Sequence, residues 1–433
     1  MATLHHKRQD ADISQAANEM RDAIQTFLGQ CRSPAVLEYG EPIQPLTSGE
    51  YCLEDRSGRL WIEVSSDTRT FARRILSIDK HATGVLECSI HRFGGKPGSI
   101  SFLDLDRPQT AHKAATGVRR TFAEQFRRML CRHFPGWEIT ALTSSLDLRR
   151  SFSSVFPRAL LVRSHQQIAA LACPTAEEES AFLTFALLWL DHARAHARTG
   201  TRTSLVLFLP AQAGNLTAHR VRWLNGHTEV HMFRFNEHGS AGEVDPRDLG
   251  NLDTRVQKVA FDQDPESASV HHAIDSSERS FEWAVRQNIQ ALTSTLLPRP
   301  VHSQVLAFAA GDRDLIDLLA VSPAGRLAVL ELKVAEDIHL PVQALDYWMR
   351  VKWHVERNEL QHLFPGIPLA QTAPKLLLVA PAMAFHSSCA TVLRYLSSEV
   401  EVERVGINTD WQNRFRVVLR LEGGNDPISH GSF

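Results

Sequence analysis

The sequence predicts an α/β protein with a small β-rich module at its N-terminal end. Two observations support this prediction. Short apolar runs typical of strands alternate with amphipathic runs typical of helices over residues 119–235, and the alternation returns over residues 277–407. From about residue 37 to residue 105, by contrast, the runs have the period of strands and are separated by turn residues. Strands that alternate with helices favour sheets with crossover connections.

The composition is that of a globular protein long enough for two or three domains. Of its 433 residues, 43% are hydrophobic and 22% are charged, which excludes wholesale disorder. The formal net charge is −2, so any attraction to nucleic acid has to come from local patches. The six cysteines show no CxxC spacing, which disfavours a zinc ribbon or a disulfide scaffold. The first residues lack the apolar stretch of a signal peptide, and the most apolar helical run, Ala181–Leu190, is far shorter than a bilayer span, so we expect a soluble cytoplasmic protein.

The first expected domain covers residues 1–110 and consists of a helix and the β-rich module. Its expected elements are a helix at residues 10–31, a hairpin at 50–64 with its turn at Ser57-Gly58, and strands at 84–91 and 99–105. The polar stretch 106–117 is expected to be a linker.

Two α/β domains are expected to follow, at residues 117–250 and 271–425. The elements of the first are a helix at 119–134, a hairpin at 159–173, a helix at 177–196, a strand at 204–209, a helix at 216–223 and a strand at 229–235. Those of the second are a helix at 277–296, a hairpin at 305–333, a helix at 341–356, a strand at 375–380, a helix at 386–396 and a strand at 401–407. The order is the same, which indicates either a duplication or a chance likeness of two α/β domains.

The hairpin of the last domain places acids and a lysine where they can meet. Side chains alternate along a strand, so Glu331 and Lys333 share one face. On the partner strand Asp312, Asp314 and Asp317 are the candidates, and we select Asp317 because it interrupts an apolar run, where an acid is costly unless it is paired or binds a metal. Hard oxygen ligands favour Mg²⁺ or Mn²⁺. The alternative is a solvated Glu-x-Lys pair on an edge strand.

The helix that follows offers further polar groups. Gln343 and Tyr347 lie four residues apart and therefore share a face, and both can bond phosphate oxygens or a metal-bound water. Arg350 and Lys352 add positive charge and are candidate nucleic-acid contacts. The alternative is that Gln343 is exposed and Tyr347 belongs to the core.

Asp317, Glu331-Leu-Lys333 and Gln343-x-x-x-Tyr347 together resemble the PD-(D/E)xK nuclease superfamily, in particular its RecB-like branch. The hairpin sequence is also similar to the C-terminal nuclease domain of NucS-type endonucleases. The resemblance covers about residues 276–420 and implies a restriction-endonuclease-like mixed sheet flanked by helices. It also implies Mg²⁺-dependent (or Mn²⁺-dependent) hydrolysis of phosphodiester bonds, with Asp317 and Glu331 as metal ligands, Lys333 as the catalytic lysine, and Gln343 and Tyr347 in support.

Families of this kind often carry a further acid on the helix before the hairpin. Glu282 is the candidate here for a third metal ligand, and a favourable interaction with the helix dipole is the competing explanation for acids in this turn. The upstream His of some RecB-type nucleases has no equivalent, which departs from that branch.

Other features bear on substrate and partners. Arg127 and Arg128 lie on the basic side of an amphipathic helix and could contact a phosphate backbone, although a solvated helix face has the same pattern. The middle hairpin has Arg158 or Ala159, then Ala172 and Pro174, roughly where the later one has its acids and lysine, so we expect an inactive copy. We therefore expect a DNA endonuclease, with RNA as an alternative substrate and a homodimer as one compatible assembly. The competing hypothesis is a non-catalytic nucleic-acid-binding or scaffold protein.

Overall fold

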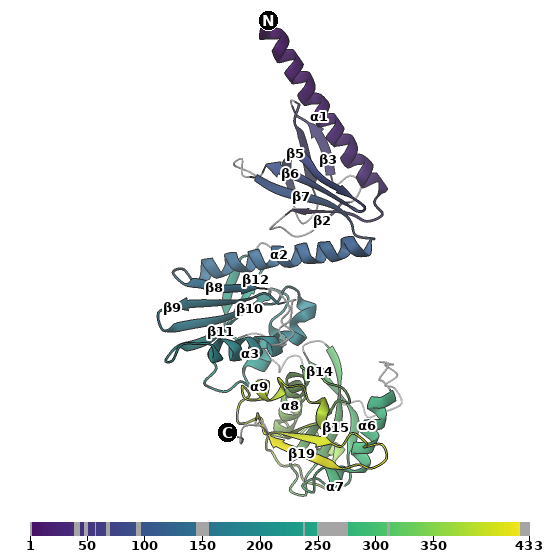
Figure 1. Cartoon of the computed structure of the whole chain (residues 1–433). Helices are drawn as coiled ribbons and strands as arrows, with labels where there is room; N and C mark the ends of the chain where they lie inside the picture. The colour runs from purple at the N-terminus through teal and green to yellow at the C-terminus, as the bar shows by residue number, and fades with distance from the viewer. Residues whose placement is uncertain are drawn as a thin grey trace, which may run out of the picture. The chain divides into compact units, whose positions relative to one another are not determined.

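The computed structural model describes residues 2–38, 44–46, 51–56, 58–65, 70–91, 97–143, 156–236, 239–248, 276–309 and 312–424. The chain is mixed α/β, as predicted, and divides into two compact units, Met1–Pro135 and Gly136–Phe433 (Figure 1). Over the residues that the structure describes, no helix combines the length and the apolar character needed to cross a membrane.

The first unit is a helix packed on an antiparallel sheet. Helix α1 (Ala2–Gln30) lies against β3 and β4, and its Ile24 and Phe27 join the core of the sheet. The sheet has the order β2-β1-β7-β6-β5-β4-β3. Its strands are β1 (Pro34–Glu38), β2 (Gln44–Pro45), β3 (Tyr51–Asp55), β4 (Leu60–Ser65), β5 (Thr70–Ala82), β6 (Val85–His91) and β7 (Pro97–Asp104). The β-rich module is thus confirmed. Of the turn expected at Ser57-Gly58, Ser57 lies outside the described residues.

The stretch expected to be a linker is helical instead. Helix α2 runs from Pro108 to His133, with Arg107 as its N-cap. Proline is compatible with the first turn of a helix, because the N–H it lacks would have no partner there, and the following Ala-His-Lys-Ala-Ala favours helix. This helix belongs to the first unit, although we expected its second half to open the middle domain.

The second unit contains two six-stranded sheets within its described part. The first has the order β13-β12-β11-β10-β9-β8, with helix α3 (Glu179–Ala195), preceded by the short η2 (Ala176–Glu178), after β10, and α4 (Asn215–Val221) after β11. Its strands are β8 (Glu138–Thr143), β9 (Arg158–Arg163), β10 (Gln166–Ala172), β11 (Arg202–Pro210), β12 (Val230–Phe235) and β13 (Ala241–Val244).

The other sheet has the order β14-β15-β16-β17-β18-β19. Its strands are β14 (His302–Ala309), β15 (Asp312–Val321), β16 (Leu327–Leu332), β17 (Lys375–Pro381), β18 (Val402–Ile407) and β19 (Val417–Glu422). The helices are α6 (Ser276–Gln287), α7 (Ile289–Leu292), α8 (Leu340–Glu356) and α9 (Cys389–Leu393), with short turns η3 (Gln361–Leu363) and η4 (Ala382–Ala384).

The two sheets match strand for strand. In each, the first three strands are antiparallel neighbours, the next two pairings are parallel, and the last strand is antiparallel. A long helix follows the third strand and a short helix follows the fourth. The repeated order predicted from the sequence is therefore a repeated topology. We call residues 136–248 the middle half and residues 276–424 the C-terminal half.

Helices cover both faces of the C-terminal sheet. Phe281 and Val285 of α6 pack with Leu330 and Leu332 on one face. The other face carries α8, whose Leu345 and Trp348 share a core with Val329. This core continues into the middle half, where it includes α3 and β11, so the two halves share one core within the second unit.

Candidate active site

A tight turn sets the register of the predicted hairpin. The Ser322 backbone N–H donates to the carbonyl of Arg326 at 2.8 Å, and Gly325 between them has a positive φ of 79°. A side chain at Gly325 would also clash, since its Cβ would lie 2.0 Å from the Pro368 carbonyl oxygen. The turn pairs Leu318 with Leu330, so Asp317 and Glu331 are the next residues in register along the two strands.

Asp317 occupies the point where the two strands part. Its Oδ2 accepts a hydrogen bond from the backbone N–H of Leu332 at 2.8 Å. Burial raises the pKa of this carboxyl to about 6, and the negative charges of Glu282 and Glu278 act in the same direction. The Leu332 bond and the Lys333 charge oppose the rise without cancelling it. Asp317 is thus a carboxylate held in an environment that disfavours its charge. The side chains of the other two candidates, Asp312 and Asp314, lie outside the described residues.

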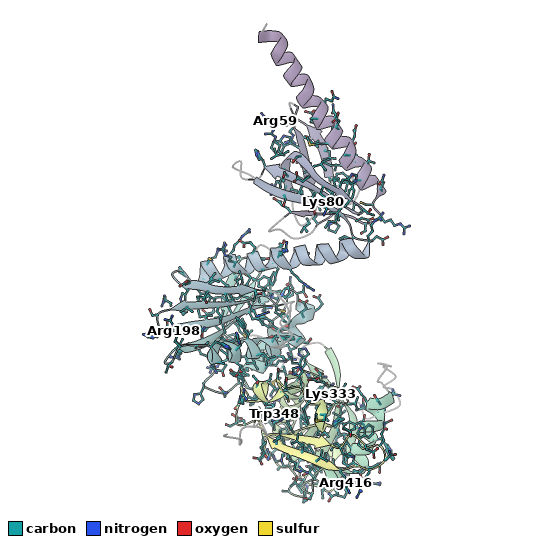
Figure 2. The ribbon with its side chains drawn as sticks, in the orientation of Figure 1. Arg59, Lys80, Arg198, Lys333, Trp348 and Arg416 are labelled. Carbon is teal, nitrogen blue, oxygen red and sulfur yellow. The ribbon has the colours of Figure 1, made fainter. Side chains whose placement is uncertain are left out.

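Glu331 and Lys333 lie on the face of β16 that packs towards α8, while Leu330 and Leu332 pack on the opposite face, as the alternation predicts. Glu331 is only 2% exposed, and its Oε1 lies 3.5 Å from the Nζ of Lys333, a labelled residue in Figure 2. Burial by itself would lower the pKa of Lys333, but the negative charges of Glu331 and Asp317 outweigh it and raise the pKa. Lys333 is therefore a fixed cation near neutral pH and not a proton acceptor.

Gln343 and Tyr347 form a pair on one face of α8, as their spacing predicts. The Nε2 of Gln343 donates to the Tyr347 hydroxyl at 3.3 Å. Tyr347 is 1% exposed and belongs to the core, whereas Gln343 is half-buried. The tyrosine thus has the structural role that we held as the alternative, and it orients the amide of Gln343.

Glu282 does not join Asp317 and Glu331 in one cluster. It lies on α6, which covers the opposite face of the sheet from α8, and its Oε2 accepts a 2.6 Å hydrogen bond from the Nε2 of Gln304. In the described part of the chain, no three acidic, histidine or cysteine side chains are grouped so that they could hold a metal ion. Glu282 instead acts on Asp317 through its charge. Metal binding by Asp317 and Glu331 stays a prediction.

Sequence reasoning missed Gln304 and Asp337 near the site, and it explained Glu278 by the helix dipole alone. Gln304 has φ of 54°, a left-handed conformation that is uncommon for residues other than glycine. This irregular position of β14 lies opposite Asp317 in the register of β14 and β15. The Gln304 amide donates to Glu282. The negative charges of Glu278 and Asp337 both raise the pKa of Lys333. Nothing in the spacing of these residues indicates such roles, because they depend on how α6, β14 and the loop after β16 pack.

The predicted nucleic-acid contacts have different outcomes. Arg350 is 3% exposed, so its guanidinium lies in the core and does not reach a phosphate backbone. Lys352 forms an ion pair with Glu356 and lies over the ring of Trp223 at 5.1 Å, in the contact between the two halves. Both predictions considered the charge of these residues but not whether their side of α8 faces the interior of the protein.

Arg127 and Arg128 lie on the exposed side of α2, each more than half exposed. Both are within 4 Å of Glu124, which offsets part of their charge. Their contact with nucleic acid stays a prediction.

No family model matches the chain. Comparisons with the curated proteins and with the solved structures also find no match.

The register identifies the counterparts of the site in the middle half. The backbone N–H of Cys173 bonds the Phe208 carbonyl as that of Lys333 bonds the Val379 carbonyl. Ala170 pairs with Ala159 as Leu330 pairs with Leu318, so Leu171 and Arg158 are in the register positions of Glu331 and Asp317. The equivalent residues are thus Arg158, Leu171 and Cys173, which corrects our assignment of Ala172 and Pro174 by one position. The middle half carries neither of the two acids.

Removing the charge of Asp317 should stabilise the metal-free protein. The pKa of this carboxyl is raised from 3.8 to about 6, so between these values the folded state binds more protons than the unfolded chain, and the free energy of unfolding falls as pH rises. In Asp317→Asn this loss disappears. We expect the free energy of unfolding of the variant to exceed that of wild type by up to about 3 kcal/mol above pH 7, and to equal it below pH 4. Urea unfolding in the presence of EDTA measures this difference. If the free energy of unfolding changed with pH equally in both proteins, the raised pKa of Asp317 would be contradicted.

Proposed function

We propose that the protein is a Mg²⁺-dependent (or Mn²⁺-dependent) nuclease of the PD-(D/E)xK type that hydrolyses phosphodiester bonds in DNA. The observation that carries the proposal is the convergence of Asp317, Glu331 and Lys333 where β15 and β16 part. A restriction-endonuclease-like fold for the C-terminal half is part of the proposal, and the mixed sheet with a helix on each face is compatible with it.

The residues present fit a hard divalent cation. The two carboxylates come from adjacent strands and both act on Lys333. Burial raises the pKa of Asp317, so a cation bound by these acids would compensate a charge that the fold disfavours. Oxygen ligands are those that Mg²⁺ prefers, and this ion commonly uses one or two protein carboxylates with waters and substrate phosphate. When bound, such an ion lowers the pKa of water and stabilises negative charge on phosphate oxygens.

The chain supplies the other parts of the chemistry. Because its pKa is raised, Lys333 presents a permanent positive charge beside the two acids and can stabilise the negative charge that develops on the phosphate in the transition state. The Leu332 N–H fixes the orientation of the Asp317 carboxylate. Gln343, held by Tyr347, offers an amide that can bond a phosphate oxygen.

Helix α6 offers a surface for nucleic acid beside the site. Arg279, Trp283 and Arg286 lie on its exposed side, with Trp283 66% exposed. An exposed aromatic ring between two guanidinium groups is suited to stack on a base while cations contact the backbone. This set replaces Arg350 and Lys352 as the proposed contacts of the C-terminal half.

We place this activity in the cytoplasm. All six cysteines fall within the described residues, and none of them forms a disulfide. Proteins of reducing compartments have this property.

The proposal is tested by incubating purified protein with single-stranded, duplex and branched DNA, and with RNA, in the presence of Mg²⁺ or Mn²⁺. We expect cleavage by wild type and none above background by Asp317→Asn or Glu331→Gln, since each removes a carboxylate charge. Glu399→Gln removes an exposed carboxylate elsewhere on the C-terminal half and should cleave like wild type. Binding of DNA without cleavage by the wild-type protein would instead favour a non-catalytic scaffold.

A further inference from the structure

The two halves of the second unit meet through the same segment on each side. Leu224 follows the short helix α4 and Leu396 follows its counterpart α9, and these two residues form an antiparallel bridge. The Asn225 N–H donates to the Tyr395 carbonyl at 2.8 Å, and the Ser397 N–H donates to the Trp223 carbonyl at 2.7 Å. Each hydrogen bond is the counterpart of the other when the halves are exchanged.

The helix contacts around this bridge have the same symmetry between the two halves. α3 of the middle half packs on α9 (Figure 1). In the same way, α8 of the C-terminal half packs on α4. Trp223 packs edge-on against Trp348 at 4.8 Å, a residue labelled in Figure 2. On the other side Tyr395 lies beneath Arg194 and its hydroxyl donates to Asp191 at 3.2 Å. The aromatic residue that precedes each bridging leucine thus packs on the long helix of the other half.

A contact of this kind is isologous, because equivalent patches meet each other across an approximate two-fold axis. Such patches normally join two separate copies of a protein. Here both lie in one chain, and each is already covered by the other. A second copy of the C-terminal half therefore cannot pair with the first through this surface.

The partner that occupies the surface offers no second site of the same chemistry. Where the C-terminal half has Asp317, the middle half has Arg158, a buried cation whose guanidinium lies 5.5 Å from the centre of the Trp189 ring. Cys173 stands where Lys333 is, and its thiol donates to the Thr175 carbonyl at 3.1 Å. A buried guanidinium repels the divalent cation that two carboxylates would attract.

We propose that the second unit is a built-in dimer with one hydrolytic site, and that the protein cuts one strand of duplex DNA in each binding event. The inference rests on the proposed nuclease function and goes beyond it by naming the product. Each event adds one water across one P–O bond, so that the phosphorus gains the hydroxyl, the leaving oxygen gains the proton, and the opposite strand stays intact.

Supercoiled plasmid with Mg²⁺ or Mn²⁺ distinguishes the outcomes. We expect open circles to accumulate first and linear DNA to appear only after a lag, when independent nicks come to lie opposite each other. Linear DNA that forms at the same initial rate as open circles, with no lag, would overturn the one-strand inference and leave the nuclease proposal intact. No cleavage of any DNA would overturn both.

A mixing experiment tests whether two active sites cooperate through some other contact. Wild type is mixed with increasing amounts of the full-length Asp317→Asn variant at constant total protein. We expect activity to fall in direct proportion to the wild-type fraction, because each chain acts alone. A fall with the square of that fraction would show that two active chains are required and would overturn the inference. Glu399→Gln replaces the inactive variant in the control and should leave activity unchanged.

Discussion

Replacing Lys333 with methionine should lower the rate of DNA cleavage by on the order of 10²–10³-fold while leaving metal binding in place. The reason is the position and charge of the amine. Its Nζ lies 3.5 Å from Glu331 Oε1, and neighbouring acids raise its pKa, so it contributes a cation and no basic nitrogen. Methionine keeps most of the volume of the side chain and removes only the charge. The rate is measured in single-turnover reactions with saturating Mn²⁺.

Two further measurements make this result specific. Isothermal titration with Mn²⁺ should give an affinity for Lys333→Met at least as high as that of wild type, because a cation beside the two carboxylates has been removed. Lys80→Met, which removes an exposed lysine from β5, should cleave like wild type. Unchanged cleavage by Lys333→Met would rule out a catalytic role for the amine, and lost Mn²⁺ binding would show that the variant had disturbed the carboxylates.

Strand alternation was sufficient to predict where the candidate site residues lie on the hairpin. It placed Glu331 and Lys333 on one face, and the buried position of Asp317 followed from a carboxyl within an apolar run. These predictions succeeded because they depend on backbone geometry over a few residues. Glu282 and Arg350 lie elsewhere than we expected, because their positions depend on which side of a helix faces the sheet. A helix with apolar residues on most of its surface, such as α8, does not reveal that side in its sequence.

The repeat could be predicted as an order of elements and no further. The exact counterparts of the site, Arg158, Leu171 and Cys173, required the register of paired strands. The contact between the two halves could not be predicted from the sequence either. The helices predicted to reach residues 223 and 396 end at Val221 and Leu393, because Leu224 and Leu396 leave the helical path to pair with each other. A contact between segments so distant in the chain leaves no local pattern.

Removing the guanidinium of Arg220 should destabilise the second unit by about 3–5 kcal/mol. Arg220 lies on α4 and forms two parallel hydrogen bonds with Asp346 of α8, from Nε to Oδ1 at 2.9 Å and from one terminal nitrogen to Oδ2 at 2.7 Å. Its other terminal nitrogen donates to the Ser180 carbonyl. Both side chains are almost fully buried, so Arg220→Ala leaves the Asp346 carboxylate in the core without its counter-ion. Urea unfolding followed by circular dichroism measures the change.

The size of this effect depends on the burial of the pair of Arg220 and Asp346, and two further variants test this dependence. Arg202→Ala breaks an exposed pair with Glu229 in the same half and should change the free energy of unfolding little, since solvent already screens that pair. The double variant Arg220→Met with Asp346→Leu removes both charges and fills the space, so it should recover most of the stability lost in Arg220→Ala. If Arg220→Ala unfolds like wild type, the pair does not hold the halves together. A marked loss instead means that the middle half, which has none of the acids of the site, still supplies part of the free energy that keeps α8 and the proposed active site folded.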